Sequence, residues 1–142
     1  MAFVRVTGSE RQMAPAYFPK KASQAFTVNS LLTFSGGEVQ PIISTDLRIA
    51  GICLQKIAST DADYAAETPI AVELIDPNAT YIGDVTTGTL TTESVGIQYD
   101  LDSDVGVNVN ATSHKQVTCV GFISATKGYF ILNGLFQTVP AV

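Results

Sequence analysis

Residues 116–132 read QVTCVGFISATKGYFIL, two apolar runs rich in β-branched and aromatic residues on either side of a short Thr126-Lys127-Gly128 turn. Apolar runs bounded by turn residues are typical of β-strands, and this spacing predicts a β-hairpin. The same pattern recurs through the rest of the chain. The sequence therefore predicts an all-β fold.

Further strands are expected wherever β-branched or aromatic residues are bounded by Gly, Pro, Asn, Asp or Ser. Such runs cover residues 25–28, 31–34, 38–43, 47–57, 69–75, 80–85, 98–101 and 105–109, and an acidic loop is expected at 58–68. Gly36-Gly37 can close a hairpin, and Thr91–Val95 can form one helical turn with Gly96 as its left-handed stop. No repeat of fixed period is visible. Many short strands with one helical turn predict a small antiparallel β-barrel or sandwich, the barrel being preferred.

The first 21 residues differ from the rest in charge and pattern. They carry a net charge of +3 and show no regular periodicity, whereas residues 22–142 carry −8, which gives −5 for the chain. We therefore expect an extended basic N-terminal arm over residues 1–21 and a single β-barrel domain over 22–142. Opposite charges on two parts of a small chain favour contact with a neighbour of mixed sign, including another copy.

The candidate partner-binding residues lie in this arm and combine apolar anchors with cationic groups. An arm that becomes ordered only on binding loses conformational entropy, so it needs apolar anchors. The candidates are Phe3, Val4, Arg5, Arg11, Met13, Tyr17, Phe18, Lys20 and Lys21.

The remaining sequence offers little for catalysis or metal binding. His114 is the only histidine and lies among polar residues, where a solvated position is the better interpretation. Cys53 and Cys119 lie in apolar runs and are expected to be free thiols in the core, although pairing stays open. The run from Asp100 to Gly106 imitates a calcium loop, but Ala111 stands where the last ligand is required. We expect no enzyme, cofactor or metal.

Other classes of partner are disfavoured. The acidic body lacks aromatic residues interleaved with Lys or Arg, which argues against nucleic acid. No apolar run approaches the roughly 20 residues of a membrane helix, and the first residues lack the pattern of a secretory leader. The chain contains no Trp, which disfavours a carbohydrate-binding module. Synthesis in the cytoplasm is expected.

A resemblance to a known family rests on residues 25–132. Leu90, Thr91, Val95 and Gly96 lead into a strand, and the runs Val120-Gly121-Phe122-Ile123 and Tyr129-Phe130-Ile131-Leu132 form the late hairpin. In these features the chain resembles the small β-barrel decoration (cement) proteins of tailed-phage capsids.

That resemblance implies a non-enzymatic virion protein, made in the host cytoplasm, that binds the major capsid protein on the outer surface of the head. It also implies a homo-oligomer, with a trimer favoured and a dimer possible. The alternative is another structural β protein of the virion, such as a tail-tube or head-closure subunit.

Overall fold

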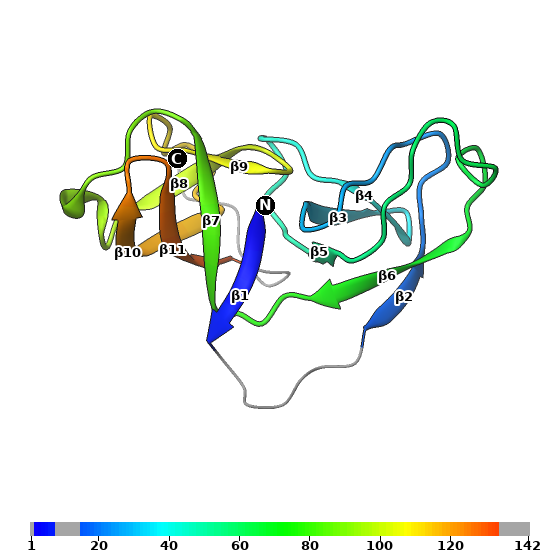
Figure 1. Cartoon of the computed structure of the whole chain (residues 1–142), viewed down its shortest axis with the longest axis horizontal. Coiled ribbons are helices and arrows are strands. Elements are labelled where there is room, and N and C mark those ends of the chain that lie inside the picture. Colours follow the sequence, from blue (N-terminus) through cyan, green and yellow to red (C-terminus); the bar gives the residue numbers. More distant parts are fainter. Residues whose placement is uncertain (1, 8–14, 134–142) are drawn as a thin grey trace.

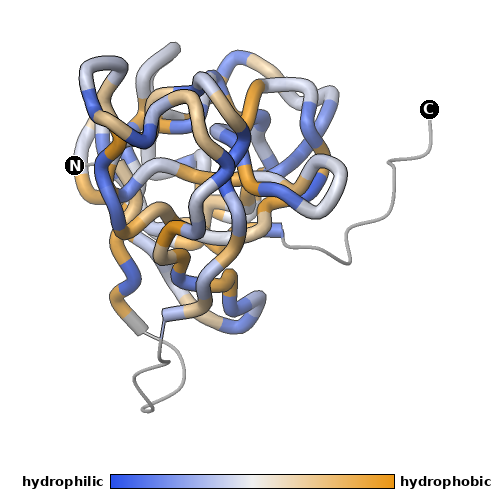
Figure 2. Tube along the Cα trace, turned by 90° about the vertical axis from the view of Figure 1, so that its right-hand side faces the viewer, coloured by the Kyte–Doolittle hydropathy of each residue, from blue (hydrophilic) through white to orange (hydrophobic). Residues whose placement is uncertain are grey.

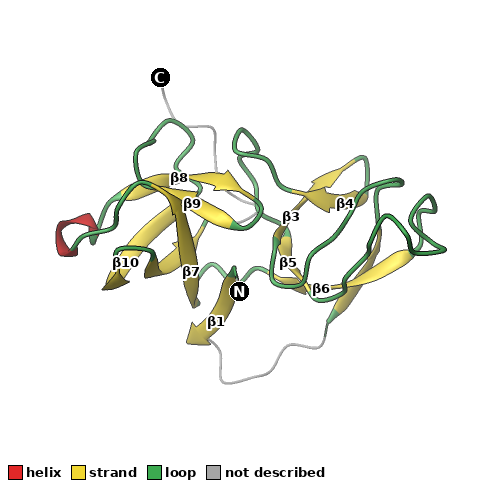
Figure 3. Cartoon of the chain, turned by 45° about the horizontal axis from the view of Figure 1, so that its top comes forward, coloured by secondary structure: helices red, strands yellow, loops and turns green. Residues whose placement is uncertain are grey.

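The computed structural model describes residues 2–7 and 15–133, which form two β modules side by side (Figure 1). The all-β prediction is confirmed, and the one helical element among the described residues is the 3-10 turn η1 (Figure 3). The elements are β1 (Phe3–Thr7), β2 (Ala16–Pro19), β3 (Leu31–Ser35), β4 (Glu38–Pro41), β5 (Gly51–Cys53), β6 (Pro69–Leu74), β7 (Thr80–Thr87), η1 (Thr92–Ser94), β8 (Gln98–Ser103), β9 (Gly106–Asn108), β10 (Val117–Ser124) and β11 (Lys127–Leu132).

The second module, which we call the C-terminal barrel, is a closed ring of the strands β7 to β11. The strands follow the order β7-β11-β10-β8-β9, and β9 returns to β7 in a parallel pairing that closes the ring. Strand β1 adds to the outside of this ring by pairing antiparallel with β7. A closed barrel leaves few exposed strand edges.

The first module, which we call the N-terminal sheet, has five strands in the order β2-β6-β5-β3-β4. All four of these pairings are antiparallel. Its outer strands approach each other, because Lys20 at the end of β2 makes a parallel bridge to Val39 of β4. The sheet is therefore curled almost into a second barrel.

The two modules share one topology. In each, the first strand pairs with the fifth, the fifth with the fourth, the fourth with the second and the second with the third, while the third meets the first in parallel. The structure therefore contains a duplicated topology, which no fixed period in the sequence indicates. The five strands β2 to β6 correspond in order to β7 to β11.

The registers of the two modules also correspond. Cys53 is paired with Val72, and the equivalent Cys119 is paired with Phe130. Each thiol donates to the backbone carbonyl two residues further along the chain, that of Gln55 or Gly121. Both cysteines are buried and free, as expected from the sequence.

The start of the second strand is built alike in both modules. Asn29 precedes β3 with φ of 69°, and Gly96 precedes β8 with φ of 90°. The amide of each donates to the carbonyl of its module's cysteine, at 2.8 Å for Asn29 and 2.7 Å for Gly96. A left-handed residue at this point favours Asn or Gly, since both tolerate positive φ better than other residues.

Two apolar clusters hold the fold together. One lies inside the N-terminal sheet and includes Phe26, Leu32 and Val72. The other fills the C-terminal barrel and extends to the outer face of the N-terminal sheet, where Leu31 and Ile52 join it. The alternation of hydrophobic and hydrophilic residues along the chain follows from strands that have one face inside (Figure 2).

The expectation of an extended arm is corrected for the described part of residues 1–21. Residues 3–7 form β1 in the sheet of the C-terminal barrel, and residues 16–19 form β2 in the N-terminal sheet. Each segment is four or five residues long and pairs with residues at least 50 positions away, in β6 or β7. A sequence pattern this short carries little signal, because most of its stabilisation comes from tertiary pairing.

Several strand boundaries also differ from those expected. The hairpins 31–41 and 117–132 are confirmed. Residues 25–28 contribute only the bridge of Phe26 to Ile57, and the expected strand 47–57 is reduced to β5. The intervening Ile49 is buried without belonging to a strand, so burial alone explains its apolar character.

Candidate protein-docking surfaces

The first predicted binding residues belong to the folded core. Phe3 is fully buried and its amide donates to the carbonyl of Asn29, which ties β1 to the N-terminal sheet. Val4 is half-buried, and Arg5 forms an ion pair with Asp76 at 3.3 Å. Phe3 therefore joins the two modules within the chain and leaves no surface for a partner.

The predicted lysines have structural roles. Lys20 is fully buried and its Nζ donates to the backbone carbonyls of Tyr64 and Ala66. Lys21 is half-buried, and its Nζ lies 3.7 Å from a carboxylate oxygen of Glu38. Pairing with carbonyls compensates for the burial of the Lys20 ammonium group, which would otherwise be costly.

The predicted aromatic residues divide between core and surface. Phe18 packs edge-on against Phe34 with ring centroids 5.0 Å apart. Tyr17, on the other face of β2, is 65% exposed, which is the largest exposed fraction among the exposed large hydrophobic side chains described. Arg11 and Met13 lie outside the described residues.

Tyr17 also lies at an open edge of β2. The amide of Lys20 donates to Thr68 beside β6, whereas that of Lys21 donates to Val39 of β4. Because backbone amides alternate in direction along a strand, the amide of Tyr17 points to the side away from β6. In the part of the chain that the structure describes, no strand pairs with residues 16–18 on that side.

The equivalent edge in the C-terminal barrel is filled. By the register of the two modules, Tyr17 corresponds to Ile82, which pairs with Val4 of β1. In the C-terminal barrel this edge is paired with β1, whereas in the N-terminal sheet the equivalent edge of β2 has no added strand among the described residues. Pro15 and Pro19 flank it and lack amide hydrogens, so Tyr17 is the one donor along this short edge.

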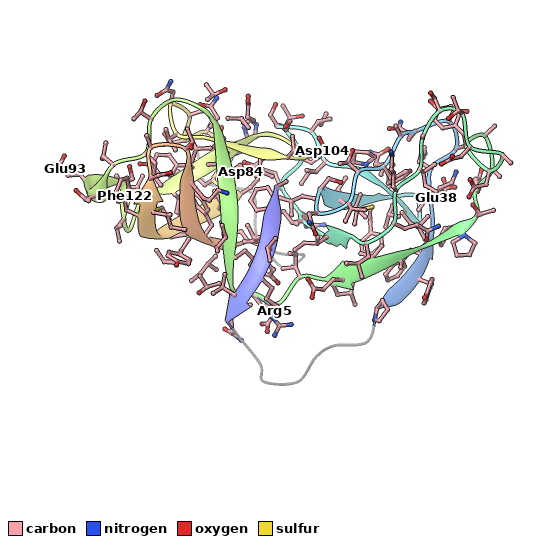
Figure 4. All side chains as sticks on the ribbon, viewed as in Figure 1. Arg5, Glu38, Asp84, Glu93, Asp104 and Phe122 are labelled. Atoms are coloured by element: carbon pink, nitrogen blue, oxygen red, sulfur yellow. The ribbon has the colours of Figure 1, made fainter. Side chains whose placement is uncertain are left out.

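A second surface lies at the far end of the C-terminal barrel. Five large apolar side chains are exposed on β10 and on the segment that follows η1, with Phe122 and Glu93 at the same end in Figure 4. Hydrogen bonds between Gly96, Ile97 and Cys119 hold the two segments together. We call this surface the apolar end; it consists of Val95, Ile97, Val120, Phe122 and Ile123.

The sequence contains a signal for the apolar end, although none of its residues is among the candidate partner-binding residues. The run Val120-Gly121-Phe122-Ile123 has no alternation of apolar and polar residues, so a strand there cannot direct all of its apolar side chains inward. Two irregularities in the β10–β11 register accompany this run. The strand consequently projects beyond the barrel core with both faces partly exposed.

Two carboxylates of the calcium-like stretch, those of Asp100 and Asp102, accept hydrogen bonds from protein groups. Asp100 accepts hydrogen bonds from the amides of Ser113, His114 and Lys115, and lies 3.2 Å from His114 Nδ1. Burial alone would raise the pKa of Asp100, but these donors together hold it below its ordinary value. Asp100 thus anchors the loop before β10.

Asp102 likewise serves the barrel itself. One of its carboxylate oxygens accepts from the hydroxyl groups of Thr86 and Thr87, at 2.9 and 2.8 Å. Throughout residues 2–7 and 15–133, no group of three or more His, Cys, Asp or Glu side chains is arranged to hold a metal ion. No helix in these residues has the length and apolar character needed to cross a membrane.

Comparison with known proteins gives no match: no family model, curated protein or solved structure is similar to the chain.

Proposed function

We propose that the protein is a non-enzymatic structural protein of a virion that decorates the outer surface of a tailed-phage capsid and stabilises it. Its partner would be the major capsid protein, and it would act as a homo-oligomer, with a trimer favoured over a dimer. Support comes from the resemblance of residues 25–132 to capsid decoration proteins and from two exposed surfaces suited to binding proteins.

The observation that carries the proposal is the open edge of β2. An exposed strand edge with an exposed aromatic side chain is a site at which an extended segment of another protein can add to a sheet. The chain itself offers the precedent, since β1 adds to the equivalent edge of β7. In this proposal a segment of the capsid subunit pairs with β2 and contacts the ring of Tyr17.

Such a contact would be weak by itself. The prolines at 15 and 19 limit the edge to the single Tyr17 donor, so the added strand makes few hydrogen bonds. An oligomer that presents several edges to a symmetric lattice gains avidity from linked weak contacts. This combination suits a protein that covers a capsid surface.

The test measures binding to phage heads. Purified protein is mixed with undecorated and mature heads, the heads are pelleted, and the bound chain is measured. Stoichiometric binding to undecorated heads is expected. Absence of binding to every type of head would remove the capsid proposal.

Two substitutions of Tyr17 test the edge itself. Tyr17→Pro removes the outward amide hydrogen without touching the donors that face β6, and we expect about tenfold weaker binding to heads. Tyr17→Thr keeps the amide and removes the ring, so it separates backbone pairing from side-chain contact. Binding unchanged in both variants would exclude this edge as the capsid contact.

The alternative is a tail-tube or head-closure subunit, which would form rings or tubes without a capsid. Negative-stain images of the purified protein separate the two functions. Small discrete particles are expected for a decoration protein, and long tubes would favour the alternative.

A further inference from the structure

The contact between the two modules uses a defined face of the N-terminal sheet. Leu31 and Ile52, paired on β3 and β5, are buried and join the core of the C-terminal barrel. The amide of Leu31 donates to the carbonyl of Asp104, in the β8–β9 turn, at 2.7 Å. The β8–β9 turn of one module thus packs on the β3–β5 face of the other, between the modules in Figure 4.

Side-chain hydrogen bonds add to this contact. Gln116, just before β10, donates from Nε2 to the carbonyls of Ser44 and Asp46 in the N-terminal module, at 2.7 and 2.8 Å. The contact is therefore specific in orientation, because buried amide groups need partners in fixed positions.

The C-terminal barrel carries the equivalent face, and it is exposed. By the shared register, Leu31 corresponds to Gln98 and Ile52 to Thr118, which pair with each other on β8 and β10. Gln98 is exposed and Thr118 half-buried. This face adjoins the apolar end of the barrel.

The surroundings of the two faces match closely. Val28 and Val95 stand at equivalent positions before β3 and β8 and are 44% and 47% exposed. Leu54 and Val120, each directly after its module's cysteine, are 40% and 39% exposed. Ile97, Phe122 and Ile123 add further apolar surface in the C-terminal barrel alone.

We propose that this face of the C-terminal barrel, with the apolar end beside it, binds the N-terminal sheet of a second copy of the chain. The β3–β4 turn of the second copy, Ser35 to Glu38, would pack against Gln98 and Thr118 as the β8–β9 turn packs against Leu31 and Ile52. Copies would thus associate head to tail. The partner is a second copy because the chain already contains one such contact between its own modules.

The positions of the two surfaces suit this arrangement. Glu38 at the β3–β4 turn and Phe122 at the apolar end lie at opposite ends of the molecule in Figure 4. A surface that binds a different surface at the opposite end makes a heterologous contact. In the proposed trimer this contact closes into a small discrete ring, whereas a contact that did not close would give a filament.

The chemistry of the face suits association between separately folded chains. Its centre is polar at Gln98 and Thr118, whereas the contact within the chain is apolar at Leu31 and Ile52. Interfaces between proteins that also exist apart are about as polar as other protein surfaces, with an apolar core contributed by a few side chains. Phe122 and Val120 are the expected anchors.

The first experiment measures the mass of the whole chain in solution by light scattering and sedimentation over a range of concentrations. We expect multiples of the 15.0 kDa chain, and association about tenfold weaker or more in Val120→Glu and Phe122→Glu. The matched control is Leu54→Glu, at the equivalent and equally exposed position of the other module, which should associate normally. A monomer at all concentrations, or equal loss in the control, would overturn the proposal.

A second experiment fixes the orientation. Chains with Ser35→Cys and chains with Val120→Cys are mixed and treated with a short bifunctional thiol reagent, with the native protein as the control for Cys53 and Cys119. Cross-links between the two variants are expected in the mixture. A dominant link between two Val120→Cys chains would show a symmetric contact and contradict the head-to-tail arrangement.

This inference deepens the homo-oligomer part of the proposed function, and it rests on that part alone. Both experiments use the protein without capsids, so self-association and capsid binding can fail separately. A native protein that is monomeric at all concentrations and still binds heads through Tyr17 would oppose the self-association and support the capsid contact.

Discussion

Lys20 is a residue at which the two modules differ in chemistry. Its equivalent in the C-terminal barrel is Val85, since both bridge in parallel to the third strand, at Val39 and Val107. The backbone hydrogen bond is the same at both positions: the amide of Lys20 donates to the carbonyl of Thr68, and the amide of Val85 donates to the carbonyl of Thr126. A lysine therefore occupies a position that an apolar side chain can fill.

We expect Lys20→Met to cost no more than about 1–2 kcal/mol of the free energy of unfolding, because it fills the same space without a buried cation, while the carbonyl of Ala66 loses its donor. Lys20→Ala should cost about 2–4 kcal/mol, since it leaves a cavity in addition to that carbonyl. Urea denaturation of the two variants measures the difference. Equal losses would mean that the ammonium group itself stabilises the module.

Asp100 should make the stability dependent on pH. Burial acts to raise its pKa, but hydrogen bonds from Lys115, His114 and Ser113 outweigh burial and hold the pKa below the ordinary 3.8. Its stabilising effect is therefore complete above about pH 4 and is lost as the pH falls through the lowered pKa of the folded state.

The matched variant is Asp100→Asn, which keeps the shape and removes the charge. It should be less stable than the native protein at pH 6, and the two should converge as the pH approaches 2. Urea midpoints measured across this range provide the test. A constant difference at every pH would contradict the assignment.

At the scale of elements, the turn that leads into the second strand of each module depends on one left-handed residue. Gly96→Ala should cost about 1–2 kcal/mol: space exists for the added Cβ, but φ of 90° is strained for any residue with a side chain. Asn29→Gly, at the equivalent position, should be nearly neutral. Denaturation curves for both variants test the equivalence, and an alanine at 96 without cost would contradict it.

The elements that the sequence predicted are those with local signals. Gly36-Gly37 identified the first hairpin and Thr126-Lys127-Gly128 the last, because each turn needs residues of particular backbone freedom. The helical turn before Gly96 was also found, as η1. Strands β1 and β2 were missed because their stabilisation comes from distant partners.

The duplication of the modules could not be predicted from residue identities. The cysteines and the valines at 28 and 95 are identical at equivalent positions of the two modules. At other equivalent positions the residue types differ: Lys20 corresponds to Val85 and Leu31 to Gln98. A fold constrains the spacing and direction of strands more strongly than it constrains which apolar residue fills each position. The open edge at Tyr17 and the exposed face at Gln98 emerge only from that structural comparison.

At the scale of the whole molecule, the modules should unfold as one unit. Leu31 and Leu32 are adjacent on β3, yet Leu31 joins the cluster shared with the C-terminal barrel and Leu32 the cluster inside the N-terminal sheet. Phe3 in β1 also belongs to the shared cluster, and its amide donates a hydrogen bond to the carbonyl of Asn29. Neither module can lose its partner without exposing this apolar surface, so calorimetry should show a single transition.

The pair Leu31→Ala and Leu32→Ala tests that cooperativity. Each removes one buried leucine and should cost about 2–5 kcal/mol, lowering the single transition temperature by several degrees. If the modules were independent, Leu32→Ala would instead lower one of two transitions and leave the other in place. A single transition in both variants would mean that the two modules unfold as one cooperative unit through the cluster that they share.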